Sequence, residues 1–246
     1  MSKTIQELEV QAVNIRKSVL EMIKRAKTGH TGSDLSCTDI LVSLYYHVLN
    51  VSAKAPNNPD RDRYIQSKGH AAEVAGIEMN TGSLGHGLSV SVGIALAAKL
   101  DKKDYQTYTL LGDGELAEGS VWEGAMAAAH YKLDNLTAII DRNGLQISGE
   151  SEDVMGVNPL DKKFEAFGWQ VIEVKDGNDI AALIAAFETP HQPGKPKMII
   201  AHTVKGKGVS FAENQAAWHH KVPTDNEYEQ AFNELNQQLE VIANGN

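Results

Sequence analysis

The sequence predicts an α/β fold, a parallel sheet with helices on both faces, formed by one domain over residues 1–246. Three observations support this prediction. The chain has 246 residues and is 42% hydrophobic, which suffices for one large core but not for two ordinary domains and a linker. Strand-like segments alternate with helical ones in its second half, as in parallel sheets. Polar, glycine-rich motifs directly follow two of these strands, where such sheets bind ligands.

The first elements are helical. Residues 5–26 carry apolar side chains at roughly helical spacing. A second helix is predicted through residues 40–45, with Ser36 or Thr38 as its N-cap. Residues 88–100, rich in Ala, Val and Leu, predict a third helix. This part of the chain therefore supplies helices that can cover a sheet.

The α/β alternation begins after the third helix. Residues 56–63, PNNPDRDR, read as a polar loop before it. The predicted strands are residues 105–111, 136–141, 169–174 and 197–202, and the helices among them are residues 117–131 and 180–187. Residues 226–239 predict an amphipathic helix, which either docks on its own domain or contacts a partner.

Composition excludes several classes of protein. The formal net charge of −9 makes nucleic acid or an anionic membrane a poor partner. Cys37 is the sole cysteine, so no internal disulfide forms, and a lone thiol suits a reducing cytosol. Residues 1–11 do not read as a signal peptide, and no stretch approaches the ~18 apolar residues of a membrane span. The sequence predicts a cytoplasmic protein without a membrane segment.

The strongest motif joins two strand ends. Gly112-Asp113-Gly114-Glu115 ends one strand, and Asn143 follows the next strand along the chain. Glycines allow close backbone approach to a phosphate, and a helix N-terminus behind them favours an anion. Carboxylate and amide oxygens are hard ligands suited to Mg²⁺ or Ca²⁺. Gly-Asp-Gly alone fits an ordinary strand-to-helix turn equally well, and the spacing to Asn143 favours a site.

Here the sequence resembles a known family. The segment LLGDGELAEGSVWEGAMAAAHYKLDNLTAIIDRNGLQISG is very similar to the thiamine-diphosphate signature of transketolases, and the resemblance extends from His30 to His219. It implies thiamine diphosphate and Mg²⁺ as cofactors, with Ca²⁺ or Mn²⁺ as possible substitutes. The implied metal ligands are the Asp113 carboxylate, the Asn143 side chain and the Leu145 carbonyl. The implied cofactor contacts in this motif are Gly112, Asp113, Gly114, Glu115 and Asn143.

A second motif, GSLGHG over residues 82–87, leads into the third helix. From the residues alone it is either a helix-entry loop or a site for anion or backbone contact. The resemblance implies that Gly82, Ser83 and Leu84 lie along the thiazolium and pyrimidine side of the cofactor. His86 stands where many transketolases have Gln.

Three histidines lie in glycine-flanked or polar loops, namely His30, His70 and His219. A histidine without further evidence of function is more often a surface or helix-capping residue. We interpret His130, which lies on a predicted helix, as structural. The resemblance implies that the three line the cleft around the reacting carbon and assist proton transfer, and that His70 and His219 also contact the cofactor. His220 stands where the family usually has Gly.

Two glutamates in the helix over residues 117–131 have two interpretations. Glu118 and Glu123 are five residues apart and do not share one face closely, so both can be solvated carboxylates. The resemblance implies instead that they couple two active sites across a subunit interface.

Two features of the family are lacking. The chain stops near the end of the diphosphate-binding domain, and the pyrimidine-binding domain with its activating glutamate does not follow. Glu73 also runs directly into Val74, where relatives carry a longer stretch with a Gly-His-Pro loop. By resemblance, the chain is expected to need a second subunit.

The expected function is that of the N-terminal subunit of a split transketolase. With a pyrimidine-binding C-terminal partner subunit, in an α₂β₂ assembly, it transfers a two-carbon ketol unit from a ketose phosphate to an aldose phosphate. One alternative is the α subunit of a 2-oxo acid decarboxylase type of thiamine-diphosphate enzyme, and another is a non-catalytic cofactor-binding subunit. We disfavour a Rossmann nucleotide binder because no G-x-G-x-x-G follows a strand with an acid about twenty residues on.

Overall fold

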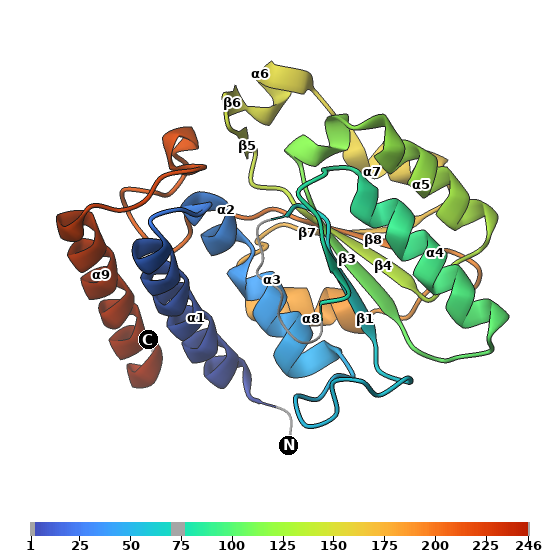
Figure 1. Cartoon of the computed structure of the whole chain (residues 1–246), viewed down its shortest axis with the longest axis horizontal. Coiled ribbons are helices and arrows are strands. Elements are labelled where there is room, and N and C mark those ends of the chain that lie inside the picture. Colours follow the sequence, from blue (N-terminus) through green and yellow to red (C-terminus); the bar gives the residue numbers. More distant parts are fainter. Residues whose placement is uncertain (1–2, 70–76, 246) are drawn as a thin grey trace.

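The computed structural model describes residues 3–69 and 77–245 (Figure 1). Within them, six parallel strands form a sheet in the order β2-β1-β3-β4-β8-β7. These strands are β1 (Arg63–Gln66), β2 (Met79–Asn80), β3 (Thr107–Gly112), β4 (Leu136–Asp141), β7 (Gln170–Val174) and β8 (Lys197–Ala201). Two short strands, β5 (Leu145–Gln146) and β6 (Gly149–Glu150), form an antiparallel hairpin beyond the end of β4. The predicted parallel α/β fold is confirmed.

The central strands are apolar on both faces. Along β3, Leu110 packs into one hydrophobic cluster and Leu111 into another, and Ile139 and Ile140 of β4 divide in the same way. All four side chains are fully buried. Successive strand residues point to opposite faces, so a sheet covered on both sides requires such continuous apolar runs.

Helices cover the two faces in layers (Figure 1). On one face lie α4 (His86–Leu100), α5 (Gly119–His130) and α7 (Leu160–Ala166). On the other face lie α3 (Thr38–Ser43), the π-helix η1 (Leu44–Val48) and α8 (Ile180–Glu188), with α1 (Ile5–Ala26) packed outside α3 and α8. The shorter helices are α2 (Thr31–Ser36), η2 (Gly114–Ala117), α6 (Ser151–Met155) and η3 (Ala216–Trp218).

The C-terminal helix α9 (Asp225–Asn244) packs along α1, as Figure 1 shows. Both helices begin with a capping box, from Thr4 in α1 and from Thr224 in α9. Their contact buries Leu20 of α1 and Leu235 of α9 completely. The predicted amphipathic helix therefore docks on its own chain.

Several predicted boundaries shift. The N-cap prediction is wrong, because α2 precedes α3, Cys37 is the N-cap residue of α3, and neither candidate hydroxyl caps that helix. Thr38 Oγ1 donates to the Asp34 carbonyl over 2.9 Å, and Ser36 Oγ lies 2.9 Å from the Ser33 carbonyl and 2.6 Å from Asp141 Oδ2. The predicted polar loop ends one residue early, because Arg63 already belongs to β1.

The other helices start close to their predicted positions. The predicted helix over residues 88–100 begins at His86, and the one over residues 117–131 begins at Gly119, after the 3₁₀ turn η2. In the part of the chain that the structure covers, no helix has the length and apolarity that crossing a bilayer requires.

Candidate functional site

The two predicted strand ends lie side by side. Gly112 at the end of β3 pairs with Asp141 at the end of β4, and the main-chain N–H of Asp113 donates to the Asp141 carbonyl over 3.3 Å. Beyond β4 the chain turns back, and the N–H of Gly144 donates to Oδ2 of Asp113 over 2.7 Å. Gly144 has φ = +77°, a conformation that favours glycine. The juxtaposition of Asp113 with residues 143–145, predicted from the strand ends, is present in the structure.

Asp113 is only 2% exposed, and its two carboxylate oxygens have different surroundings. Oδ1 accepts from the adjacent N–H of Gly114 over 2.8 Å. Oδ2 accepts from Arg142 Nη1 over 2.9 Å, from Gly144 and from Ser151 Oγ over 3.1 Å. Burial raises the pKa of Asp113, and the Arg142 guanidinium and these hydrogen bonds oppose that rise.

The other two predicted metal ligands lie in the same turn. Asn143 Oδ1 accepts from the N–H of Leu145 over 3.2 Å, and the Leu145 carbonyl accepts from Lys205 Nζ over 2.9 Å. Among the described residues, no group of three or more His, Cys, Asp or Glu side chains could hold a metal ion. A cation at this turn would therefore depend on the neutral oxygens of Asn143 and Leu145 beside the Asp113 carboxylate, a hard-oxygen set that fits Mg²⁺ or Ca²⁺.

A buried donor adjoins the same motif. The backbone of Gly114 lies so close to Gln146 that a Cβ on Gly114 would come within 2.8 Å of the Gln146 Cγ. The Gln146 Nε2 is buried and has no hydrogen-bond partner among the described residues. An unsatisfied amide donor beside a glycine-rich strand end suits a phosphate oxygen.

Lys205 is a functional candidate that the sequence analysis missed. Its side chain is 1% exposed, and Nζ donates both to the Leu145 carbonyl and to Nδ1 of His219, each over 2.9 Å. Burial lowers the pKa of Lys205 to about 8, and the nearby Lys68 charge acts in the same direction. The only hint in the sequence was the dipeptide Lys205-Gly206, which follows the end of β8 by a few residues.

Lys68 and Asp141 form a buried ion pair behind the site, with Lys68 Nζ 2.5 Å from Asp141 Oδ2. Ser36 and Thr203 both donate hydroxyl hydrogen bonds to the Asp141 carboxylate. Burial alone would raise the pKa of Asp141, but Lys68 and the two hydroxyls outweigh burial and lower it. The sequence analysis also missed this pair, which ties the ends of β1 and β4 to α2.

Glu115, a predicted cofactor contact, has a buried carboxylate, and the residue is 3% exposed. It accepts from Ser67 Oγ, from the N–H of Gly85 over 2.8 Å and from the N–H of Gly112 over 3.1 Å. Its side chain therefore holds three segments of the site together, and direct contact between Glu115 and the cofactor stays a prediction.

The loop over residues 82–87 is open at its tip and anchored at its base. Gly82, Ser83 and Leu84 are exposed, while Gly85 is buried. The Gly85 carbonyl accepts from Ser120 Oγ over 3.0 Å, at the start of α5. The three predicted contact residues therefore lie on an accessible loop that is fixed to α5.

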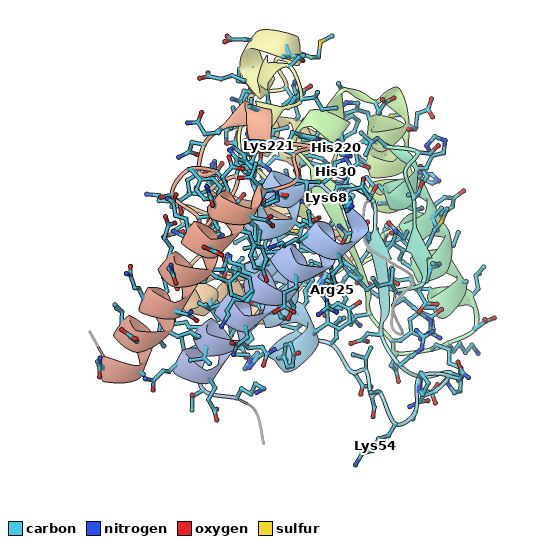
Figure 2. All side chains as sticks on the ribbon, turned by 60° about the vertical axis from the view of Figure 1, so that its left-hand side comes forward. Arg25, His30, Lys54, Lys68, His220 and Lys221 are labelled. Atoms are coloured by element: carbon cyan, nitrogen blue, oxygen red, sulfur yellow. The ribbon has the colours of Figure 1, made fainter. Side chains whose placement is uncertain are left out.

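Two of the three predicted histidines come together. The rings of His30 and His219 lie 5.6 Å apart, and the ring of His220 lies 4.5 Å from that of His30. His70 lies outside the described residues. Figure 2 shows His30 and His220 at the same end of the molecule as Lys68 and Lys221, while Lys54 lies at the opposite end and Arg25 lies between them. Cationic and imidazole side chains thus gather near the carboxyl ends of the strands.

The two predicted interface glutamates are exposed. Glu118 is the N-cap residue of α5, and Glu123 lies one and a half turns further along. Neither side chain takes part in the buried contacts of the site, so both their interpretations stay open.

Comparison with known proteins identifies the family. The family described as "Transketolase, thiamine diphosphate binding domain" matches residues 8–75 and 72–239. An apulose-4-phosphate transketolase subunit of Phocaeicola vulgatus is 43% identical over 277 aligned positions, which cover 98% of each chain. A 6-deoxy-6-sulfo-D-fructose transketolase subunit of a Clostridium species is 36% identical over 96% of this chain and 98% of its own length. The chain belongs to the family of transketolase thiamine diphosphate binding domains.

Solved structures agree with this assignment. The transketolase of Campylobacter jejuni superposes with a TM-score of 0.84 at 27% identity, over 96% of this chain and 43% of that one. Human transketolase is 36% identical over 96% of this chain, and the aligned region is 43% of its length. The chain thus spans less than half the length of these two transketolases. The predicted resemblance and fold are confirmed.

The predicted gap between Glu73 and Val74 lies outside the described residues. The two segments that match the family meet at residues 72–75. The alignment with the Phocaeicola protein runs over 277 positions although this chain has 246 residues, so that relative carries residues without a counterpart here.

Proposed function

We propose that this chain is the N-terminal, cofactor-binding subunit of a split transketolase. With a pyrimidine-binding partner subunit, it transfers a two-carbon ketol unit from a ketose phosphate to an aldose phosphate. The observation that carries the proposal is the convergence of Asp113, Asn143, Leu145 and Lys205 at the ends of β3 and β4. Family membership supports the cofactor and the reaction class.

The residues at these strand ends fit a diphosphate held through a divalent cation. Asp113, Asn143 and Leu145 offer oxygens for Mg²⁺, with Ca²⁺ or Mn²⁺ as substitutes. Lys205 supplies a buried positive charge, and Gln146 an unsatisfied amide donor, for phosphate oxygens. Local positive groups are necessary here because the chain as a whole has a net charge of −9.

The histidines are assigned to the sugar substrate. When bound, thiamine diphosphate supplies the thiazolium that accepts the electron pair as the carbon–carbon bond of the donor breaks. The ring centroids of His30 and His219 lie 5.6 Å apart, which supports the proposal that both hydrogen-bond sugar hydroxyls and move protons. The ammonium of Lys205 can only donate, so His219 accepts at Nδ1 and carries its proton on Nε2.

A partner subunit is proposed to cover the cofactor. Relatives of similar length are named as transketolase subunits, and single-chain transketolases are more than twice as long as the region they share with this chain. A cofactor that reacts in a preorganised cleft needs a second surface over it. The carboxyl ends of the strands on this chain provide one wall, and a pyrimidine-binding subunit provides the other.

Self-pairing of this chain across α5 completes the proposed α₂β₂ assembly. The exposed positions of α5 include Gly119, Glu123 and Met126, at helical spacing, and Met126 is 53% exposed. On the neighbouring helix α4, Leu100 is 74% exposed. An exposed face with apolar and small residues favours a protein contact there, and by resemblance Glu118 and Glu123 would lie within it.

One rival function has a specific observation in its favour. The aligned relative carries residues that this chain lacks, and the family match consists of two segments that overlap at residues 72–75. If the lacking residues bind the donor sugar, this chain would bind the cofactor in a non-catalytic role. An α subunit of the 2-oxo acid decarboxylase type has less support, because the matched family and relatives are transketolases.

Reconstitution tests the proposal. The chain is purified alone and mixed with a candidate pyrimidine-binding subunit, and ketol transfer is followed in a coupled assay. We expect no turnover by the chain alone, and joint recovery of activity and tight thiamine diphosphate binding in the mixture. Light scattering gives the mass of the complex. Cofactor binding without turnover would favour the non-catalytic role, and robust turnover by the chain alone would overturn the split-enzyme proposal.

A further inference from the structure

Arg142 links the Asp113 carboxylate to a second acid. It follows β4 directly, between the buried Asp141 and the predicted ligand Asn143. Its Nη1 lies 2.9 Å from Asp113 Oδ2, and its Nη2 lies 2.7 Å from Glu152 Oε1 in α6. The Arg142 side chain is only 10% exposed, so little water screens its charge from Asp113.

The two oxygens of Asp113 leave room for a cation beside Arg142. Oδ2 already accepts from three donors, on Arg142, Gly144 and Ser151. Oδ1 accepts only from the N–H of Gly114 among the described contacts, and a carboxylate oxygen can accept more than one bond. A cation on Oδ1 therefore does not require the Arg142 bond to break, and the guanidinium and the cation would share one carboxylate.

Two like charges that share one carboxylate repel each other. The neighbouring charged groups form ion pairs of opposite charge. Lys68 pairs with Asp141, and Glu152 pairs with the Nη2 group of Arg142. Lys205 adds a further positive charge at the Leu145 carbonyl, so the three cations Arg142, Lys68 and Lys205 balance the three carboxylates Asp113, Asp141 and Glu152 before a metal ion binds. Charges in a poorly hydrated site interact more strongly than they do in water.

We propose that Arg142 is a built-in counter-ion of Asp113, which stabilises the metal-free site and lowers its affinity for a divalent cation. The inference rests on the proposed function in one respect, that Asp113 is a metal ligand. Arg142 acts through Asp113 and is a positioning residue. Its removal should have two opposite effects, since the metal-free protein loses a partner for a buried carboxylate while the metal-bound site loses a repulsion.

The experiment measures Mn²⁺ binding to the full chain by electron paramagnetic resonance of the free ion, with and without thiamine diphosphate. The variant Arg142→Met is expected to bind Mn²⁺ on the order of tenfold more tightly, and its melting temperature without metal is expected to fall. Arg142→Lys keeps the charge and is expected to bind Mn²⁺ nearly as the wild type does. A purely structural role would weaken Mn²⁺ binding and lower the melting temperature together.

A second variant keeps the test informative if Arg142→Met folds poorly. The Glu152 side chain is 40% exposed, so Glu152→Gln should fold, and it leaves the Arg142 charge less compensated. We expect Mn²⁺ binding to weaken by about threefold. Glu150→Gln, an exposed acid two residues earlier in β6, serves as the matched control and should bind Mn²⁺ as the wild type does.

The outcomes separate this inference from the proposed function. Tighter Mn²⁺ binding by Arg142→Met, including binding that the wild type does not show, supports the counter-ion role. Equal or weaker binding by Arg142→Met, with the wild type binding Mn²⁺, overturns the counter-ion role and leaves the metal assignment standing. If neither protein binds Mn²⁺ with thiamine diphosphate present, both the metal assignment and this inference are wrong.

Discussion

Lys205 Nζ donates a hydrogen bond to Nδ1 of His219 over 2.9 Å. Because an ammonium has no lone pair to offer, this bond selects the His219 tautomer with its proton on Nε2. The lysine thereby sets which ring nitrogen of His219 can donate to a substrate oxygen, while its second bond holds the Leu145 carbonyl. One buried cation thus connects a predicted metal ligand to a predicted catalytic histidine.

Replacing Lys205 should weaken cofactor binding and transfer together. Lys205→Met removes a buried positive charge from the strand ends, so thiamine diphosphate is expected to bind at least about tenfold more weakly to the assembled protein by isothermal titration. Lys207→Met is the matched control, because Lys207 lies two residues on and lines a separate cavity between α1 and α9. Equal losses in the two variants would argue against a specific role of Lys205.

Removing the Asp113 carboxylate should abolish metal-dependent cofactor binding. Asp113→Ala takes away the one carboxylate of the predicted metal set, and we expect no measurable binding of thiamine diphosphate with or without Mg²⁺. Circular dichroism should show that the fold survives, because the strands around Asp113 keep their apolar cores. Wild-type affinity in this variant would make the metal assignment wrong.

The histidine pair should serve turnover rather than cofactor binding. His30→Ala and His219→Ala are each expected to retain thiamine diphosphate but to lose on the order of 10²-fold in kcat/KM with a ketose phosphate, as when a proton-transfer group is removed. His47→Ala is the control and should keep full activity, because His47 of η1 pairs with Glu188 of α8 on the face of the sheet opposite α5. Unchanged kinetics in both site variants would return His30 and His219 to a structural role.

His191 should make stability depend on pH in the acid range. Its Nε2 lies 3.1 Å from Thr137 Oγ1, and its Nδ1 is buried with no hydrogen-bond partner among the described residues. Burial lowers the pKa of His191 from 6.5 to about 4, and the charge of Lys197 contributes. Between these two pKa values, His191 is protonated in the unfolded chain but neutral in the folded chain. The free energy of unfolding therefore falls as the pH drops from 6.5 towards 4.

His191→Gln should reduce that loss of stability, because glutamine stays neutral throughout. Urea unfolding at several pH values between about 7 and about 4.5 measures the slope, and His130→Gln on exposed α5 is the control. Parallel slopes for the wild type and His191→Gln would contradict the assignment.

The sequence predicted the central strands and their ends well, for a physical reason. Strands β3, β4 and β8 are apolar on both faces, so their runs stand out from the surrounding helices. The short strand β1 was not predicted: its first residue, Arg63, was placed in the polar loop, and only Tyr64 and Ile65 of the strand are apolar. Helix α2, six residues of mostly small polar side chains, has no apolar periodicity to reveal it.

The sequence predicted the oxygen ligands of the site but missed its cationic side chains. Asp113 and Asn143 follow strands that the pattern reveals, so their proximity could be deduced from the chain alone. The missed cations are defined by contacts with residues far away in sequence: Lys68 with Asp141, Arg142 with Asp113, and Lys205 with the Leu145 carbonyl. Such long-range contacts leave no pattern in the local sequence. The N-cap prediction failed for a related reason, since the Ser36 hydroxyl also reaches Asp141.

The buried carboxylate of Glu115 couples the local opening motions of two segments of the site. It accepts the amide protons of Gly85 and Gly112, which belong to the loop before α4 and to the end of β3. Neither amide can exchange with solvent deuterium until its bond to this carboxylate opens, so the two should exchange with correlated rates. Glu115→Ala should speed both together, and the loop that carries Gly82 to Leu84 would then fluctuate independently of the sheet.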